Sequence, residues 1–302
     1  MNMAGLFFSL LAIVGWSAYP TLVSKFGGKP TQAIFGATIG TLIVASVLAL
    51  VMHLAPPTGF SFWLAFASGA AWAFGNVLTI RAFGLTDNEG HELGSAKAMP
   101  ISTAFQITAN VLWGVIMLGN WPSMQSRLIG AVCVVIVLIG AYLTTYQEHA
   151  TAGNSALLKK AIGILLIAQI GYSLYGILPQ YTKNTDGLHM FLPQAMGMAV
   201  LGICLGLYEY VKNNDDIFSN KISYLQIISG FFFAVAALGY LVSAQPAMLG
   251  LATGFVLSQI SIVGATISGI LVMKTHKTQK EWTFIIIGLL MIVVGASVTA
   301  FL

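Results

Sequence analysis

The sequence is divided into ten long apolar stretches, and this pattern points to folding within a membrane. A helix that crosses the ~30 Å hydrocarbon layer needs about 20 residues. Only 7% of the 302 residues are charged, whereas roughly a quarter of an ordinary soluble domain is. The stretches that are long enough cover residues 3–23, 31–53, 61–83, 94–118, 126–146, 158–181, 187–210, 223–245, 250–273 and 282–302. We therefore expect an all-α membrane protein with ten transmembrane helices.

The first and second halves of the chain resemble each other. Gly15-Trp16-Ser17-Ala18-Tyr19 returns 156 residues later as Gly171-Tyr172-Ser173-Leu174-Tyr175, and further matches keep offsets of 155 to 161. Because each half holds five helices, the second half must enter the membrane in the opposite sense. We expect an inverted 5+5 repeat, with residues 1–150 as the first unit and residues 151–302 as the second. The other matching pairs are Ser68-Gly69 with Ser229-Gly230, Leu93-Gly94 with Leu249-Gly250, and Gly140-Ala141 with Gly295-Ala296.

The basic residues predict an orientation, because cytoplasmic loops carry an excess of Lys and Arg. One side of the membrane receives only Arg127 and Lys183. The other side receives Lys25, Lys29, Arg81, Lys97, Lys159, Lys160, Lys212, Lys221, Lys274, Lys277 and Lys280. This asymmetry places the second group in the cytoplasm and both termini outside a cell membrane that the chain crosses many times.

Polar residues recur at helical spacing inside the apolar stretches. A polar side chain is costly in lipid and should face protein or a water-filled cavity. In the fourth stretch, Ser102 or Thr103, Gln106 and Asn110 share one face because they lie three or four residues apart. Together with similar positions elsewhere, they give the candidate binding residues Trp16, Gln32, Trp72, Asn76, Ser102, Thr103, Gln106, Asn110, Tyr172, Gln194 and Ser258.

These residue types favour a neutral, hydroxyl-rich ligand. Amides and hydroxyls both donate and accept hydrogen bonds, as a polyol requires, and Trp and Tyr offer flat apolar faces with a polar edge. A monosaccharide fits that combination. The alternative is that the same side chains only join neighbouring helices, a contact worth on the order of 1 kcal/mol or less.

The charged residues and cysteines narrow the function further. None of the nine acidic residues lies near the middle of a stretch, and Glu209 comes closest. A carboxylate there would be typical of a proton relay or of a transporter for cations, so proton coupling stays open and cation export is disfavoured. Cys133 and Cys204 form no metal-binding spacing. We expect no cofactor, no metal, no nucleic-acid partner and no enzymatic activity, and the sequence leaves the oligomeric state undetermined.

Several segments resemble the glucose/ribose porters of the drug/metabolite transporter superfamily. The similar segments are Ser24-Lys25-Phe26-Gly27-Gly28-Lys29-Pro30, Gly36-Ala37-Thr38-Ile39-Gly40-Thr41-Leu42, Gly69-Ala70-Ala71-Trp72-Ala73-Phe74-Gly75-Asn76 and Met99-Pro100-Ile101-Ser102-Thr103-Ala104-Phe105-Gln106. The resemblance extends over essentially the whole chain. It implies ten helices and uptake of a monosaccharide across a Gram-positive plasma membrane.

The end of the fourth stretch departs from the glucose-type pattern of that family. Glucose-type members usually carry an acidic residue before Trp there, whereas this chain has Asn120 before Trp121. In this respect it is similar to the ribose uptake proteins of lactic acid bacteria. The resemblance therefore implies a sugar permease that takes up ribose ahead of glucose, and the missing carboxylate weakens the family expectation of proton symport.

Two other classes of function remain as alternatives. An exporter of amphiphilic metabolites or amino acids on the same fold would have a similar number of helices, but it would need a less polar cavity or a charge for its substrate. A membrane subunit or receptor would bind a ligand without moving it.

Overall fold

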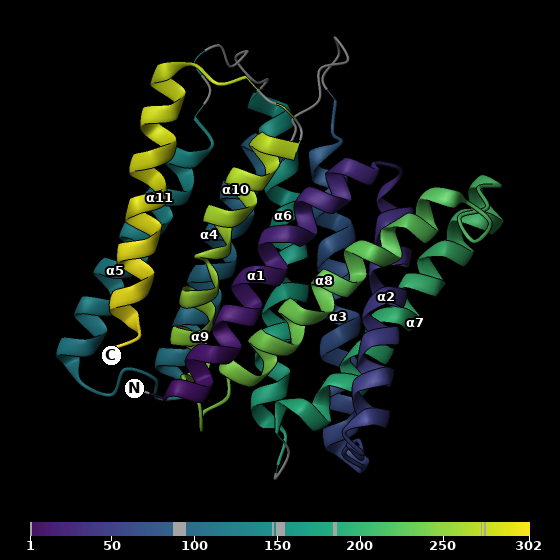
Figure 1. The fold of residues 1–302 in the computed structure, drawn as a ribbon, viewed down its shortest axis with the longest axis horizontal. Helices are drawn as coiled ribbons and strands as arrows, with labels where there is room; N and C mark the ends of the chain where they lie inside the picture. Colours follow the sequence, from purple (N-terminus) through teal and green to yellow (C-terminus); the bar gives the residue numbers. More distant parts are fainter. Residues whose placement is uncertain are drawn as a thin grey trace.

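A computed structural model describes residues 2–86, 95–146, 148, 155–183, 186–272, 274 and 276–302. The described chain is a bundle of α-helices joined by short connections (Figure 1). The Leu93-Gly94 pair and most of the connectors at residues 85–93 and 147–157 lie outside the described residues. The elements are α1 (Met3–Phe26), α2 (Pro30–Val51), α3 (Gly59–Phe83), α4 (Ser95–Ile116), α5 (Met124–Thr144), α6 (Ser155–Ile177), η1 (Leu178–Tyr181), α7 (Gly187–Asn213), α8 (Lys221–Ser243), α9 (Gly250–Ser258), α10 (Ser261–Val272) and α11 (Gln279–Thr299).

The membrane prediction is confirmed for the described residues. Nine helical segments there are long and apolar enough to cross a bilayer, with α6 and η1 forming one of them and α9 and α10 another. The fourth predicted span corresponds to α4, whose apolar part, Ile101–Ile116, is shorter. The chain is therefore an all-helical, multi-pass membrane protein.

The ninth predicted span, residues 250–273, corresponds to one membrane-spanning segment, Gly250–Val272, but this segment is not one continuous helix. It breaks between Ser258 and Ser261, where the backbone hydrogen bonds tighten from the i−4 to the i−3 carbonyl. The Ser258 hydroxyl and the Gln259 amide both donate to the carbonyl oxygen of Phe255, at 2.5 and 3.2 Å. These side-chain donors thus occupy the Phe255 carbonyl oxygen, which would accept from the backbone N–H of Gln259 in a continuous α-helix.

The helices of the two halves interleave. In Figure 1, α5 and α11 lie side by side at one edge of the bundle, and α2 and α7 lie at the opposite edge. In the middle, α8 packs against α1 and α2, and α3 packs against α6 and α7. Outside them, α10 packs against α1, α4 packs against α6, and α4 also meets α9.

Small residues allow the central helices to approach closely, as is typical of membrane bundles. A Cβ atom added to Gly15 in α1 would lie 2.5 Å from the amide nitrogen of Ala236 in α8. One added to Gly171 in α6 would lie 2.8 Å from the amide nitrogen of Gly75 in α3. In both places the side chain is absent because the neighbouring backbone occupies its space.

Three ion pairs join helix ends on one side of the bundle. Lys29, before α2, lies 2.8 Å from Asp215 after α7, and Arg81 in α3 lies 3.7 Å from Glu209 in α7. On the α5–α11 pair, the amino group of Lys280 lies 3.8 Å from the carboxylate of Glu148. All of these residues are at the end of the bundle that the Lys and Arg pattern assigns to the cytoplasm.

Candidate functional site

Aromatic side chains from three helices meet near the middle of the bundle. The ring of Trp72, near the middle of α3, lies 4.0 Å from the ring of Phe233, near the middle of α8. Tyr19 of α1 lies beside both rings, at 6.4 Å from Trp72 and 5.1 Å from Phe233. The amide of Asn76, one turn after Trp72, donates to the Tyr19 hydroxyl at 3.2 Å. Two predicted residues, Trp72 and Asn76, are thus placed together.

A second aromatic group surrounds Tyr240 of α8. Its ring lies 5.4 Å from Trp16 of α1 and 5.6 Å from Tyr175 of α6. Phe255 of α9 completes the group, with its ring edge-on at 5.7 Å from Tyr240. Trp16 and Tyr19 lie three residues apart on α1, so that helix carries one ring into each group.

The polar face of α4 is internally bonded, as its spacing predicts. The Gln106 amide donates to the Ser102 hydroxyl at 3.1 Å, and the Asn110 amide donates to the Gln106 backbone carbonyl at 2.9 Å. Asn110 is 1% exposed, and its side-chain oxygen faces the Gly176 backbone and the Tyr240 hydroxyl. Asn110 therefore joins the Tyr240 group, with Gln106 and Ser102 one and two turns away on α4.

Two predicted residues, Gln32 and Gln194, are placed elsewhere. The Gln32 side chain accepts from the backbone N–H of Lys29 at 2.8 Å and so caps the start of α2 at one end of the bundle. Gln194 is fully buried between α7 and α3, where its amide donates to the Ser68 hydroxyl at 2.9 Å. Both side chains make the local or interhelical bonds that the alternative interpretation predicts.

The remaining predicted residues lie at the margins of the two groups. Ser258 is buried at the end of α9, one turn beyond Phe255. Tyr172 of α6 contacts α3, since its ring would lie 3.4 Å from a Cβ on Gly75, next to Asn76. Thr103 is half-buried on α4.

Five aromatic residues of these groups are absent from the predicted site. They are Tyr19, Tyr175, Phe233, Tyr240 and Phe255. The repeated Gly-aromatic-Ser-x-Tyr phrase could have revealed Tyr19 and Tyr175, because each is its last residue. For Tyr240 the signal was weaker, because the matching position in the first half is Thr79.

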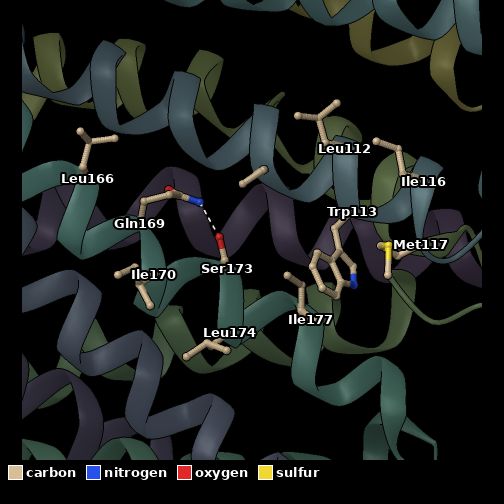
Figure 2. Close-up of a pocket in the computed structure, with 11 residues that line it drawn as sticks. Leu112, Trp113, Ile116, Met117, Leu166, Gln169, Ile170, Ser173, Leu174 and Ile177 are labelled. Carbon is tan, nitrogen blue, oxygen red and sulfur yellow. Dashed lines mark hydrogen bonds between the residues drawn. The ribbon is translucent and has the colours of Figure 1, made fainter.

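A groove of about 580 Å³ runs between α4 and α6, away from these rings (Figure 2). Its walls are mostly apolar and include Leu112, Ile116 and Ile170, which are half or more exposed. Figure 2 shows the Gln169 amide donating to the Ser173 hydroxyl at 3.0 Å inside it. Its exposed apolar walls suit lipid chains better than a sugar.

The polar atoms at the two aromatic groups belong to amides and hydroxyls, which are neutral over the physiological range of pH. They can hydrogen-bond a neutral polar molecule while the rings cover its apolar surface. The arrangement therefore suits selective binding of an uncharged, hydroxyl-bearing solute.

Comparison with known proteins gives consistent results. The model of the family described as "Sugar transport protein" matches residues 7–302. Two relatives are called "Putative ribose uptake protein RbsU". The one from Staphylococcus aureus (strain N315) is 49% identical and the one from Staphylococcus epidermidis 46% identical, over 100% of both chains. A solved crystal structure with 15% sequence identity matches with a TM-score of 0.70, covering 99% of this chain and 98% of the other, and so shares the fold.

Proposed function

The chain belongs to the sugar transport protein family, and from this membership we propose that it carries ribose into the cell, with glucose as the second candidate. Relatives of the same length that are named for ribose uptake support this choice. The observation that carries the proposal is the meeting of aromatic rings with buried amide and hydroxyl groups at Trp72, Asn76, Asn110 and Tyr240. An exporter of amphiphilic compounds is not favoured by these findings.

We propose that the two halves form an inverted repeat about a pseudo-twofold axis. The helix contacts support it, because each contact has a counterpart after exchange of the halves. The contact of α1 with α8 corresponds to that of α6 with α3, and the contact of α1 with α10 corresponds to that of α6 with α4. The α2–α7, α4–α9 and α5–α11 contacts each join a helix to its own counterpart.

Contacts between individual residues also support the inverted repeat. The close approach of Gly15 to the Ala236 amide nitrogen is repeated by Gly171 and the Gly75 amide nitrogen, at the offsets found in the sequence. Trp72 and Phe233 are equivalent at an offset of 161, and their ring centroids lie 4.0 Å apart. A contact between equivalent residues must lie close to the axis, so the aromatic groups are at the interface of the two units.

Transport then follows from rocking of the halves about this interface, which exposes the bound sugar to each side in turn. We propose that the ion-paired end of the bundle faces the cytoplasm and that both termini are outside the cell. Glu209 lies at that end, paired with Arg81, and so does not offer a carboxylate to the aromatic groups. Facilitated diffusion requires no titrating group there, and we propose it over proton symport.

Purified protein in liposomes tests the function. We expect labelled ribose to enter down its gradient without a proton gradient, and unlabelled ribose to compete better than glucose or other pentoses. Acidifying the outside should change the flux little. A proton current that follows ribose would contradict facilitated diffusion, and tight ribose binding without counterflow would contradict transport.

Asn76→Ala tests the first aromatic group, formed by Tyr19, Trp72 and Phe233. The change removes the amide that donates to the Tyr19 hydroxyl, and a buried hydroxyl left without a partner costs ~1–3 kcal/mol. We expect ribose uptake to fall about tenfold, measured as initial rate per inserted protein. Thr144→Ala in α5, which removes a hydroxyl bonded within its own helix, is the control and should transport normally. Wild-type uptake by the Asn76 variant would remove this residue from the site.

A further inference from the structure

Gly176 in the last turn of α6 lies against two polar side chains from other helices. A Cβ atom added to Gly176 would lie 2.7 Å from the Tyr240 hydroxyl of α8 and nearer still to the side-chain oxygen of Asn110 of α4. Because both oxygens lie so close to one point, a single hydroxyl group of a ligand can reach both at hydrogen-bond distance. Helices α4 and α8 thus bring their two oxygens together against Gly176 of α6.

Both oxygens lack a hydrogen-bond partner among the described residues. Asn110 and Tyr240 are only 1% and 2% exposed, and a buried polar atom left unbonded is destabilising. The Asn110 amide nitrogen is already bonded to the Gln106 carbonyl, so this side chain has only its oxygen to offer. Native structures rarely leave such a pair unsatisfied, so a water molecule or a ligand group is needed to complete it.

The chemistry of the two atoms defines that group. An amide oxygen only accepts a hydrogen bond, whereas a tyrosine hydroxyl can donate one. Tyr240 can also accept, but its own O–H then stays unbonded, so a group that satisfies both side chains must donate to Asn110 and accept from Tyr240. An alcohol does so, whereas an ammonium group only donates, and a carboxylate or an ether oxygen only accepts.

We propose that one hydroxyl group of the transported sugar binds between the Asn110 side-chain oxygen and the Tyr240 hydroxyl, against Gly176. This inference rests on the proposed function and deepens it by naming the contact that selects for a hydroxyl. The rings of Trp16 and Tyr175, at 5.4 and 5.6 Å from the Tyr240 ring, offer apolar faces to the carbon skeleton of the sugar. Gly176 is part of the subsite because a side chain there would displace both oxygens.

Deoxy sugars test the subsite directly. Ribose and its 2-, 3- and 5-deoxy analogues compete for labelled ribose uptake in liposomes that contain wild-type protein, Tyr240→Phe or Asn110→Leu. Wild type should discriminate against one analogue by about tenfold, because that analogue lacks the bound hydroxyl. Both variants should lose discrimination against that same analogue, and their relative affinities for the other analogues should stay as in wild type. Tyr240→Phe removes only the hydroxyl, and Asn110→Leu keeps the branched shape with a larger side chain, so unfolding is checked as a lower midpoint of thermal unfolding in detergent.

Ser223→Ala is the matched control. Its hydroxyl is also buried on α8 and unpartnered in the described part of the chain, but it lies near the start of that helix, far from Gly176. This variant should behave as wild type with all four sugars. If Tyr240→Phe and Asn110→Leu keep the wild-type pattern, or lose affinity equally for all sugars as they would if a water filled the gap, the subsite is wrong. Absence of ribose flux with wild-type protein would instead refute the proposed function.

Discussion

Replacing Gly69 with alanine should destabilise the transporter strongly. A Cβ atom on Gly69 in α3 would lie 2.7 Å from the carbonyl carbon of Gln194 in α7 and would overlap the carbonyl oxygen. The obstacle is backbone, so the two helices must separate. Overpacking costs roughly 1–3 kcal/mol and occasionally more, and we expect the upper end of that range. The midpoint of thermal unfolding in detergent, together with the yield of folded protein, measures the effect.

Gly163→Ala is the control for that substitution. Gly163 lies within α6, and no heavy atom comes within 4 Å of a Cβ added there. Alanine is favoured over glycine in a helix by up to about 1 kcal/mol, so this variant should be as stable as wild type or more so. Equal unfolding midpoints for the two variants would show that α3 and α7 do not pack as closely as described.

Replacing Trp72 with alanine should abolish most ribose uptake. Trp72 is 4% exposed and packs against Phe233, and truncating a buried aromatic side chain costs about 3–5 kcal/mol. The change also removes a ring from the proposed sugar site. We expect uptake per folded protein to fall more than tenfold, as measured by initial rates in liposomes normalised to the folded fraction.

Two further variants separate packing from transport. Trp72→Phe keeps a ring against Phe233 and should recover most of the stability but only part of the uptake. Trp63→Ala removes the same side chain from the same helix at a position that is 61% exposed, and both stability and uptake should remain near wild type. If Trp63→Ala were as damaging as Trp72→Ala, the loss would not depend on the central aromatic group.

The helices could be predicted from hydropathy because lipid leaves backbone polar groups no partner outside their own segment. The break at Gln259 could not, because the mean hydropathy of Gly250–Val272 stays that of a membrane span despite Ser258, Gln259 and Ser261, and only side-chain hydrogen bonds to the Phe255 carbonyl mark the change. The depth of a polar residue within the bundle was also hard to predict. Gln32 is of a residue type expected in a binding site, but its side chain caps the start of α2.

Sequence spacing predicts which polar residues share one helix face, but not which side chains from distant helices lie beside them. Asn110 and Gln106 share a face of α4, and their spacing alone indicates it. The ring of Tyr240 in α8 lies beside Trp16 of α1 and Tyr175 of α6, and no local pattern encodes those contacts. The match of Trp72 to Phe233 was present in the 161-residue offset, yet an offset does not say that the two rings touch.

The contact between Trp72 and Phe233 has a mechanical consequence for the proposed transport cycle. In the proposed inverted repeat, the two halves exchange conformations between the two access states, so an interhelical contact away from the axis would be replaced by the equivalent contact. Trp72 and Phe233 are equivalent residues, so their contact would be retained in both states. It would act as a fulcrum, a fixed point about which the halves tilt. Because one side of it is indole and the other is phenyl, the two tilts need not have equal energy, and the resting transporter would favour one of them.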